Sequence, residues 1–205
     1  MPNWDRVDSP APGRPYVALL RGINVGGRNK LPMRELAAMF VDVGCEDVRT
    51  YIQSGNVVFR APSALAKGIP ARLTDAIAAS HGYQIPVVMR TASDFDRVVR
   101  GNPFVAAGAD PAKLHVGFLA AEPDPTRVAQ LDPDRSPPDA FEVRYREVYL
   151  HLPAGVARSK LDNAYFDRTL NTVCTIRNWR TVRRLQEMAS GDWGHGFRGR
   201  GEIGT

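Results

Sequence analysis

The sequence predicts an α+β protein made of two related units that follow one another along the chain. Over residues 15–91, apolar alternation and helical spacing occur in the order strand–helix–strand–strand–helix–strand, which is the order of a ferredoxin-like domain. Over residues 92–190, the order strand–helix–strand–strand–helix recurs after a short helix, with a final helix in place of the last strand. The 205 residues, 43% of them hydrophobic, are enough to bury two small packed cores. We therefore expect a ferredoxin-like subdomain at 15–91 and a second α+β subdomain at 92–190 packed on it.

The first unit begins with an expected strand at Tyr16–Val25, an apolar run that ends in a glycine-rich loop. A helix then opens at Pro32, where the missing proline N–H is not needed, and ends at Gly44. Leu36 and Phe40 lie on the apolar face of this helix. The other expected elements are a strand, a tight turn, a strand, a helix with an irregular first part and a strand, at Val48–Ile52, Gln53–Asn56, Val57–Arg60, Ser63–His81 and Ile85–Arg90.

The second unit begins with a short helix at Ser93–Arg100, which Gly101 and Pro103 end. Its other expected elements are a strand, a short helix, a hairpin of two strands around Arg146-Glu147, and two helices, at Leu114–Ala120, Thr126–Leu131, Phe141–Tyr145, Val148–Leu152, Lys160–Leu170 and Trp179–Ala189. Across both units, the residues on the apolar sides of these elements are expected to be buried, among them Leu36, Phe40, Val57, Phe59, Val87 and Trp179.

Composition limits the kinds of partner that the chain can have. The net charge of +5 and the pI of about 9.5 permit binding to polyanions or phosphorylated ligands without requiring it. No apolar run approaches the roughly 18 residues of a membrane span, and the first residues lack the apolar segment of a signal peptide. We expect a cytoplasmic protein with no membrane contact, a disordered arm at 1–14, a disordered tail at 191–205, and free, inert thiols at Cys45 and Cys174.

Three motifs connect the chain to a known family: YVALLRGINVGGRNKLPMRELAAMF, DVRTYIQSGNVVF and TIRNWRTVRRL. They closely resemble the domain-of-unknown-function family numbered 1697, which is found mainly in bacteria, and the resemblance extends over about residues 15 to 190. It implies a cytoplasmic α+β protein with ferredoxin-like halves and implies no activity. Two departures are visible, since the family usually has lysine at Arg28 and favours a Leu-Gly pair at Leu170-Asn171. The first keeps the charge, and the second alters only a helix end.

The expected topology brings two loops to one edge of the first sheet. In a split βαβ unit the first two strands are parallel and the third lies between them, so the loops that leave strands one and two share an end of the sheet. We therefore expect the loop at 22–27 and the turn at 53–56 to lie side by side. The polar and glycine residues that meet there would be Asn24, Gly26, Gly27, Gln53, Ser54 and Asn56.

The glycine-rich loop has two possible roles. Gly22, Gly27 and Arg28 imitate the spacing of a P-loop, but Asn29 stands where the Mg²⁺-binding hydroxyl would be, and Pro32 delays the helix. A nucleoside triphosphatase is therefore not expected. The loop either serves a turn that needs positive φ, or it binds an anion with the help of Arg21, Arg28 and Lys30.

The third motif contains a run of arginines on an expected helix. The apolar residues of this motif fall on one face of the expected helix and are predicted to be buried in the core. The role of the arginines is left open by this pattern; they are Arg177, Arg180, Arg183 and Arg184. A solvated basic face is the favoured interpretation. The alternative is a phosphate clamp that also uses Ser159-Lys160.

The sequence predicts a binding protein more readily than an enzyme. The histidines and acidic residues are dispersed, and no nucleophile motif is present, so we expect no metal, no cofactor and no identifiable catalytic residue. The favoured ligand is a phosphate-bearing small molecule or nucleotide at the sheet edge. The alternatives are an enzyme for a small phosphorylated or carboxylated substrate at the same edge, and single-stranded nucleic-acid binding, which the scarcity of aromatic residues on the central strands disfavours. The candidate ligand-binding residues are Arg21, Gly22, Asn24, Gly26, Gly27, Lys30, Gln53, Ser54, Asn56, Lys160, Arg177 and Arg180.

Overall fold

The computed structural model describes residues 13–191. The expected disordered arm at 1–14 and tail at 191–205 lie outside the described residues, except for residues 13, 14 and 191. Arg14 is not part of a disordered arm, because it is the first residue of strand β1. None of the helices within 13–191 is long and apolar enough to cross a bilayer.

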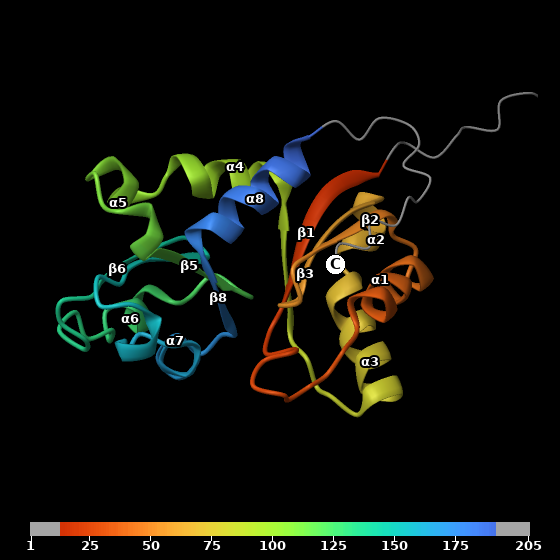
Figure 1. The fold of residues 1–205 in the computed structure, drawn as a ribbon, viewed down its shortest axis with the longest axis horizontal. Helices are drawn as coiled ribbons and strands as arrows, with labels where there is room; N and C mark the ends of the chain where they lie inside the picture. Colours follow the sequence, from red (N-terminus) through yellow and green to blue (C-terminus); the bar gives the residue numbers. More distant parts are fainter. Residues whose placement is uncertain (1–12, 192–205) are drawn as a thin grey trace, which may run out of the picture.

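The first half forms a four-stranded antiparallel sheet in the order β2-β3-β1-β4. Its strands are β1 (Arg14–Leu20), β2 (Glu46–Tyr51), β3 (Asn56–Ala61) and β4 (Val87–Thr91). Helices α1 (Met33–Asp42), α2 (Ser63–Ala66) and α3 (Ile69–His81) pack on one face of this sheet (Figure 1). β1 is apolar on every residue from 17 to 20 because both faces of the sheet are covered.

The second half forms another four-stranded antiparallel sheet, in the order β6-β7-β5-β8. Its strands are β5 (Leu114–Leu119), β6 (Ala140–Arg144), β7 (Glu147–His151) and β8 (Cys174–Asn178), and its helices include α6 (Pro125–Val128) and α7 (Asn163–Leu170). The expectation that a helix replaces the last strand is wrong, since β8 precedes the final helix, α8 (Trp179–Ser190). The sequence hid β8 because three of its five residues are polar and only its pairing with β5 makes it a strand.

Two helices lie between the sheets and join the halves. α4 (Ala92–Arg100) packs against α8, and α8 contacts strands of both sheets, as Figure 1 shows. Their apolar faces meet Val17 and Leu19 of β1 on one side and Val116 and Phe118 of β5 on the other. The shorter helices are α5 (Pro103–Ala106), η1 (Pro111–Lys113) and η2 (Val156–Arg158). The two units therefore share one central apolar cluster.

Several element boundaries differ from the expected ones. The first strand ends at Leu20 instead of Val25, because the residues beyond it turn with positive φ at Gly22 and Asn24. The hairpin turns at Tyr145-Arg146, one residue earlier than expected, and Tyr145 has positive φ. The expected helix at Lys160–Leu170 begins later, at Asn163, since Asp162 caps its first turn. The expected helix at Thr126–Leu131 begins one residue earlier, at Pro125 after the cap Asp124, and ends at Val128.

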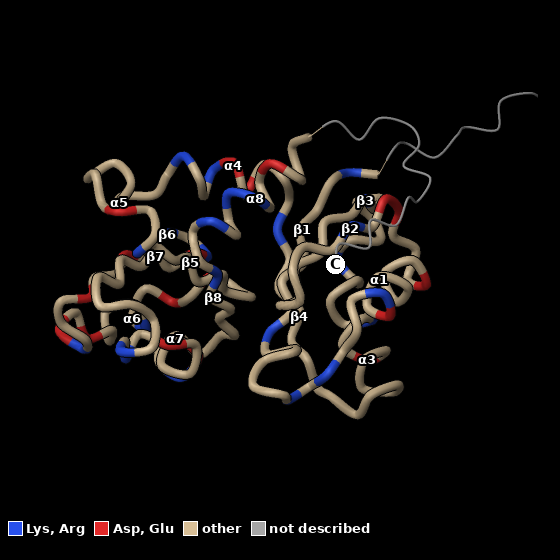
Figure 2. The backbone as a smooth tube through the Cα atoms, viewed as in Figure 1, with Lys and Arg blue, Asp and Glu red and all other residues tan. Residues whose placement is uncertain are grey.

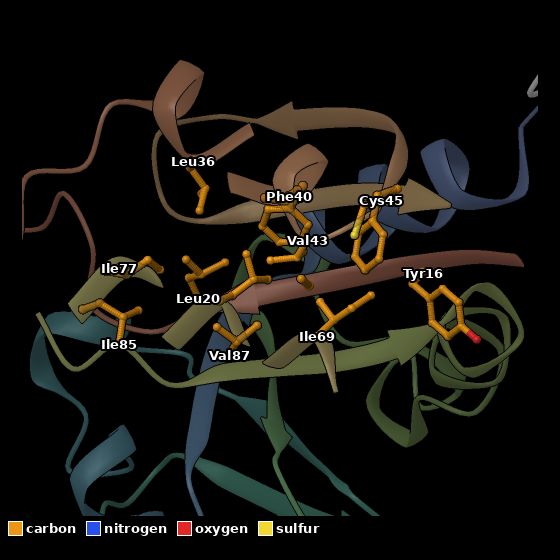
Figure 3. Close-up of a cluster of buried hydrophobic side chains, with 14 of the residues drawn as sticks. Tyr16, Leu20, Leu36, Phe40, Val43, Cys45, Ile69, Ile77, Ile85 and Val87 are labelled. Carbon is orange, nitrogen blue, oxygen red and sulfur yellow. The ribbon is translucent and has the colours of Figure 1, made fainter. Parts of the chain in front are cut away.

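The expected core is confirmed. The six residues predicted to be buried, Leu36, Phe40, Val57, Phe59, Val87 and Trp179, are each at most 9% exposed. In the cluster between the first sheet and α1 and α3 (Figure 3), the rings of Phe40 and Phe59 lie 5.0 Å apart between centroids. Helical and strand periodicity thus identified the correct face of each of these elements.

Both cysteines are buried and free, as expected. Burial raises the pKa of each thiol to about 12, and for Cys174 this effect outweighs the opposing influence of Arg21 and Arg177. We predict that neither thiol reacts with iodoacetamide in the folded protein near neutral pH, because the thiolate is the nucleophile. Mass spectrometry should find both residues alkylated in urea and neither without it. Equal labelling in the two conditions would contradict the prediction.

Candidate anion site

The loop after β1 and the turn between β2 and β3 lie side by side, as the topology predicted. The backbone N–H of Leu20 donates to the carbonyl of Gly55 at 2.8 Å, and the amide of Asn24 donates to the carbonyl of Gln53 at 3.0 Å. Gly55 has φ of +74°, and a Cβ there would come within 2.8 Å of Leu20. The QSGN turn therefore needs glycine for its backbone conformation and for its contact with β1.

The glycine pair of the first loop forms the tip of a tight hairpin. Val25 and Arg28 form an antiparallel bridge, with the N–H of Arg28 donating to the carbonyl of Val25 at 3.0 Å. Gly26 and Gly27 have φ of 57° and 76°, the signs that a primed two-residue turn requires. This conformation accounts for the glycine pair without a ligand.

Asn24 holds the loop in place. Its side chain donates to the carbonyl of Leu31 and accepts the N–H of the same residue, both at 2.8 Å. Together with its bond to Gln53, these contacts occupy the amide and set the path of the chain into α1. The side chain of Asn29 adds a bond to the carbonyl of Gly22 at 2.9 Å.

The loop separates two hollows, and the predicted site residues divide between them. One, which we call the α1 hollow, has a volume of about 600 Å³ and is lined by Asn24, Gly27, Lys30, Leu31, Pro32, Met33, Arg34 and Gln53. The other, which we call the interface cleft, has a volume of about 350 Å³ and lies between the halves. It is lined by Leu20, Arg21, Gly22, Ile23, Val25, Ile52, Ser54, Asn163, Thr175, Ile176, Arg177, Asn178 and Thr181.

Four candidate residues line neither hollow. Gly26 is exposed at the hairpin tip, and Asn56 is fully buried behind the cleft. Lys160 and Arg180 have exposed side chains, and the backbone N–H of Lys160 donates to the hydroxyl of Ser136. The basic residues of α8, drawn blue in Figure 2, fall at positions 180, 183 and 184 in the first half of the helix, and none of them lines either hollow. The alternative interpretation of the arginine run, a clamp that also uses Lys160, is therefore not assembled around one hollow.

Arg177 joins the two halves at the floor of the interface cleft. From β8, its five N–H groups reach the first half at Asn56 (2.6 Å) and at the carbonyls of Leu20 (2.7 Å) and Ser54 (3.2 Å). They also reach Thr175 and the carbonyl of Ile176. Every acceptor is neutral, and burial lowers the pKa of Arg177 to about 10. Within residues 13–191, no carboxylate pairs with this cation, which therefore leaves a positive charge at the cleft.

Arg21 is the other cation that lines the cleft. Its guanidinium forms an ion pair with Asp167 of α7, whose second carboxylate oxygen accepts the N–H of Cys174 at 2.7 Å. Asp167 is not part of the lining. Among the described residues, the cleft is thus lined by two arginines and no carboxylate.

The polar groups left over in the cleft are hydrogen-bond donors. The hydroxyl oxygens of Ser54 and Thr175 already accept hydrogen bonds from Asn56 and Arg177, and neither hydroxyl donates to another described residue. Thr181 is 4% exposed, and its hydroxyl has no partner within 13–191. Asn163 and Asn178 use their side-chain oxygens for the N–H groups of Ile176 and Thr181, which leaves their amide nitrogens available. Such a lining suits an anion.

Sequence reasoning missed part of this set. Thr175, Asn178 and Thr181 belong to the TIRNWRTVRRL motif, but only Arg177 and Arg180 of that motif were predicted as site residues. Asn163 comes from another element, α7, and joins them only because its oxygen binds the edge of β8. Thr175 and Arg177 flank apolar Ile176, but Asn178 breaks the alternation, so the motif carries no clear signal for these polar residues.

Comparison with a family model shows to which protein family the chain belongs. The model for the family described as a protein of unknown function, DUF1697, matches residues 14–149. The chain belongs to the DUF1697 family. The match confirms the resemblance seen in the first two motifs, and it ends before the third.

The fold of this DUF1697 protein also occurs in a solved structure. The chain is similar to the conserved bacterial protein SP0830 from Streptococcus pneumoniae, with a TM-score of 0.68 and 24% sequence identity. The similarity covers 86% of this chain and 99% of that one, and it supports a common α+β fold. No curated protein matches the sequence.

Proposed function

We propose that this DUF1697 protein binds a small phosphate-bearing molecule, and that the anionic group of this molecule lies in the interface cleft. The observation that carries the proposal is the cation of Arg177, which has only neutral hydrogen-bond partners within the described chain. All five of its donors are used, so its contribution is charge. The donors that would contact the anion are the hydroxyls of Ser54, Thr175 and Thr181 and the amide of Asn163.

Two observations favour a small ligand over nucleic acid. The volume of about 350 Å³ is near the lower end of the range for small-molecule sites. Tyr16 and Phe59, the aromatic residues of β1 and β3, are buried and stacked on each other with 5.8 Å between ring centroids, so they offer no surface for bases.

The order βαββαβ and the strand order β2-β3-β1-β4 support our inference that the first half is ferredoxin-like. Free, buried thiols are compatible with a cytoplasmic location.

Binding is favoured over catalysis by the chemistry of the lining. Within residues 13–191, the lining of the interface cleft includes no histidine, cysteine or carboxylate that could act as a general acid, base or nucleophile. Their donors can hold an anion, but they do not form a pair of groups that would exchange a proton with a substrate.

Exchanging Asn163 for aspartate should strongly weaken anion binding while leaving the fold intact. The variant Asn163→Asp keeps an oxygen for the N–H of Ile176, replaces a free donor by a carboxylate oxygen, and places a negative charge favourably at the start of α7. Loss of one charge-assisted hydrogen bond, about 1.5–3 kcal/mol, weakens binding at least about 10-fold. Calorimetry with inorganic phosphate and a nucleoside monophosphate would measure this at fixed ionic strength.

Three control variants distinguish anion binding in the interface cleft from a non-specific effect of the protein's net charge. Gln130→Glu makes the same charge change at an exposed residue outside both hollows and should bind like the wild type. Thr181→Val removes a cleft hydroxyl and should weaken binding, whereas Thr50→Val, in β2, should not. Lys30→Ala should also bind normally. Loss of binding in Lys30→Ala with normal binding in Asn163→Asp would place the anion in the α1 hollow and refute the proposal, as would an absence of binding to the wild type.

A further inference from the structure

Two exposed aliphatic side chains lie at the rim of the interface cleft. Val25 is 62% exposed and Ile52 is 52% exposed, and both belong to the lining. They come from the two loops that the hydrogen bond between Asn24 and Gln53 holds together. Ile176, which is half-buried, also lines the cleft and continues this apolar surface into it. The cleft therefore has an apolar side in addition to its donors.

The backbone at Ile52 is strained in a way that keeps this side chain at the rim. Ile52 has φ of +47°, in the left-handed region, where a β-branched residue is a rare outlier. Asparagine or glycine would adopt this conformation at lower cost, and burial does not explain the choice of isoleucine because the side chain is exposed. Strained residues of this kind concentrate at ligand-binding sites.

A tight hairpin positions the side chain of Val25 at the rim of the cleft. Val25 begins this hairpin, whose tip is the Gly26-Gly27 pair. Each of the two side chains is thus placed by its own turn, and both turns end at the same cleft.

We propose that the ligand of the interface cleft is an amphipathic anion, with a short aliphatic group that packs on Val25 and Ile52 while its phosphate meets the donors beside Arg177. This inference rests on the proposed anion site and adds the chemical class of the rest of the ligand. An alkyl phosphate is the simplest molecule that carries both parts. The two exposed residues are too few to form a stable interface with a second copy of the chain, which in general needs about 800 Å² from each partner.

The test uses a homologous series of ligands on the full chain. Inorganic phosphate, ethyl, butyl and hexyl phosphate, and 1-hexanol are compared by calorimetry at fixed ionic strength. Affinity should rise by up to about fourfold for each methylene group that reaches the rim, and 1-hexanol should bind far more weakly than hexyl phosphate.

The variant Ile52→Asn separates the apolar contribution from the anion site. It should bind inorganic phosphate like the wild type and lose most of the dependence on chain length. It should also melt at a higher temperature, because asparagine tolerates positive φ. Val25→Ser is a second variant that should flatten the series, and Val156→Ser, at a residue that is 58% exposed outside the cleft, is the matched control.

The outcomes distinguish this inference from the proposed function. Phosphate binding with no dependence on chain length would overturn the amphipathic ligand and leave the anion site. No binding of phosphate or of any alkyl phosphate would overturn both. Equal binding of 1-hexanol and hexyl phosphate, or a dimer in sedimentation analysis that Ile52→Asn dissociates, would also overturn the amphipathic ligand.

Discussion

Replacing Arg90 by alanine should lower the free energy of unfolding by about 3–5 kcal/mol, the cost of breaking a buried ion pair from one side. Arg90 lies in β4 of the first half, and its guanidinium bonds to Glu147 in β7 of the second half at 2.8 Å. Their side chains are 0% and 2% exposed. Arg90 also donates to the carbonyls of Leu119 and Arg146 at 2.7 and 2.9 Å. The alanine variant would leave a carboxylate and two carbonyls buried without these partners.

Urea denaturation followed by circular dichroism would measure the loss. The double variant Arg90→Met/Glu147→Leu removes both charges and should recover much of the stability, because two apolar residues avoid the uncompensated charge. Arg97→Ala breaks the more exposed pair with Asp94 and should cost at most about 1 kcal/mol. Similar losses for Arg90→Ala and Arg97→Ala would show that the buried pair does not hold the halves together.

Replacing Phe40 by alanine should cost about 3–5 kcal/mol, because the ring is completely buried and its removal leaves a cavity. Phe40 projects from α1 onto the first sheet (Figure 3). Its ring packs there against that of Phe59 in β3. The next residue on the same helix, Val41, is 57% exposed and provides a matched control. Val41→Ala should change the stability by less than about 0.5 kcal/mol.

The same urea measurement compares the two variants. If Phe40→Ala were no more destabilising than Val41→Ala, the packing of α1 on the first sheet would have to be revised. A change in the slope of the unfolding free energy against urea would instead indicate that Phe40→Ala alters the unfolded state or the cooperativity.

Sequence patterns within a few residues correctly predicted the buried face of α1 and the turn between β2 and β3. Helical spacing identified Leu36 and Phe40 as core, and glycine chemistry identified the QSGN turn between β2 and β3. The contact between that turn and the loop after β1 also followed from the sequence, because strand order alone brings the two together. The strand β8 did not follow, since its residues satisfy no clear alternation and it forms by pairing with β5.

The candidate site was predicted only in part because most of its partners are far apart in the sequence. Arg177 and Ser54 were candidates, but the sequence could not tell that all five N–H groups of Arg177 are used by neutral acceptors. Arg21 was also a candidate, but the sequence could not tell that it pairs with Asp167, 146 residues further along the chain.

The sequence by itself determined the apolar faces, the turns that need glycine and the meeting of two loops at one sheet edge. Each of these depends on side-chain spacing or on backbone conformation within a few residues. The tertiary structure alone decided that a cleft exists, because α4 and α8 pack between the two sheets and bring β8 and α7 against the loops of the first half. It also decided the charge of that cleft, since whether an arginine remains without an acidic partner depends on which residues the packing places beside it.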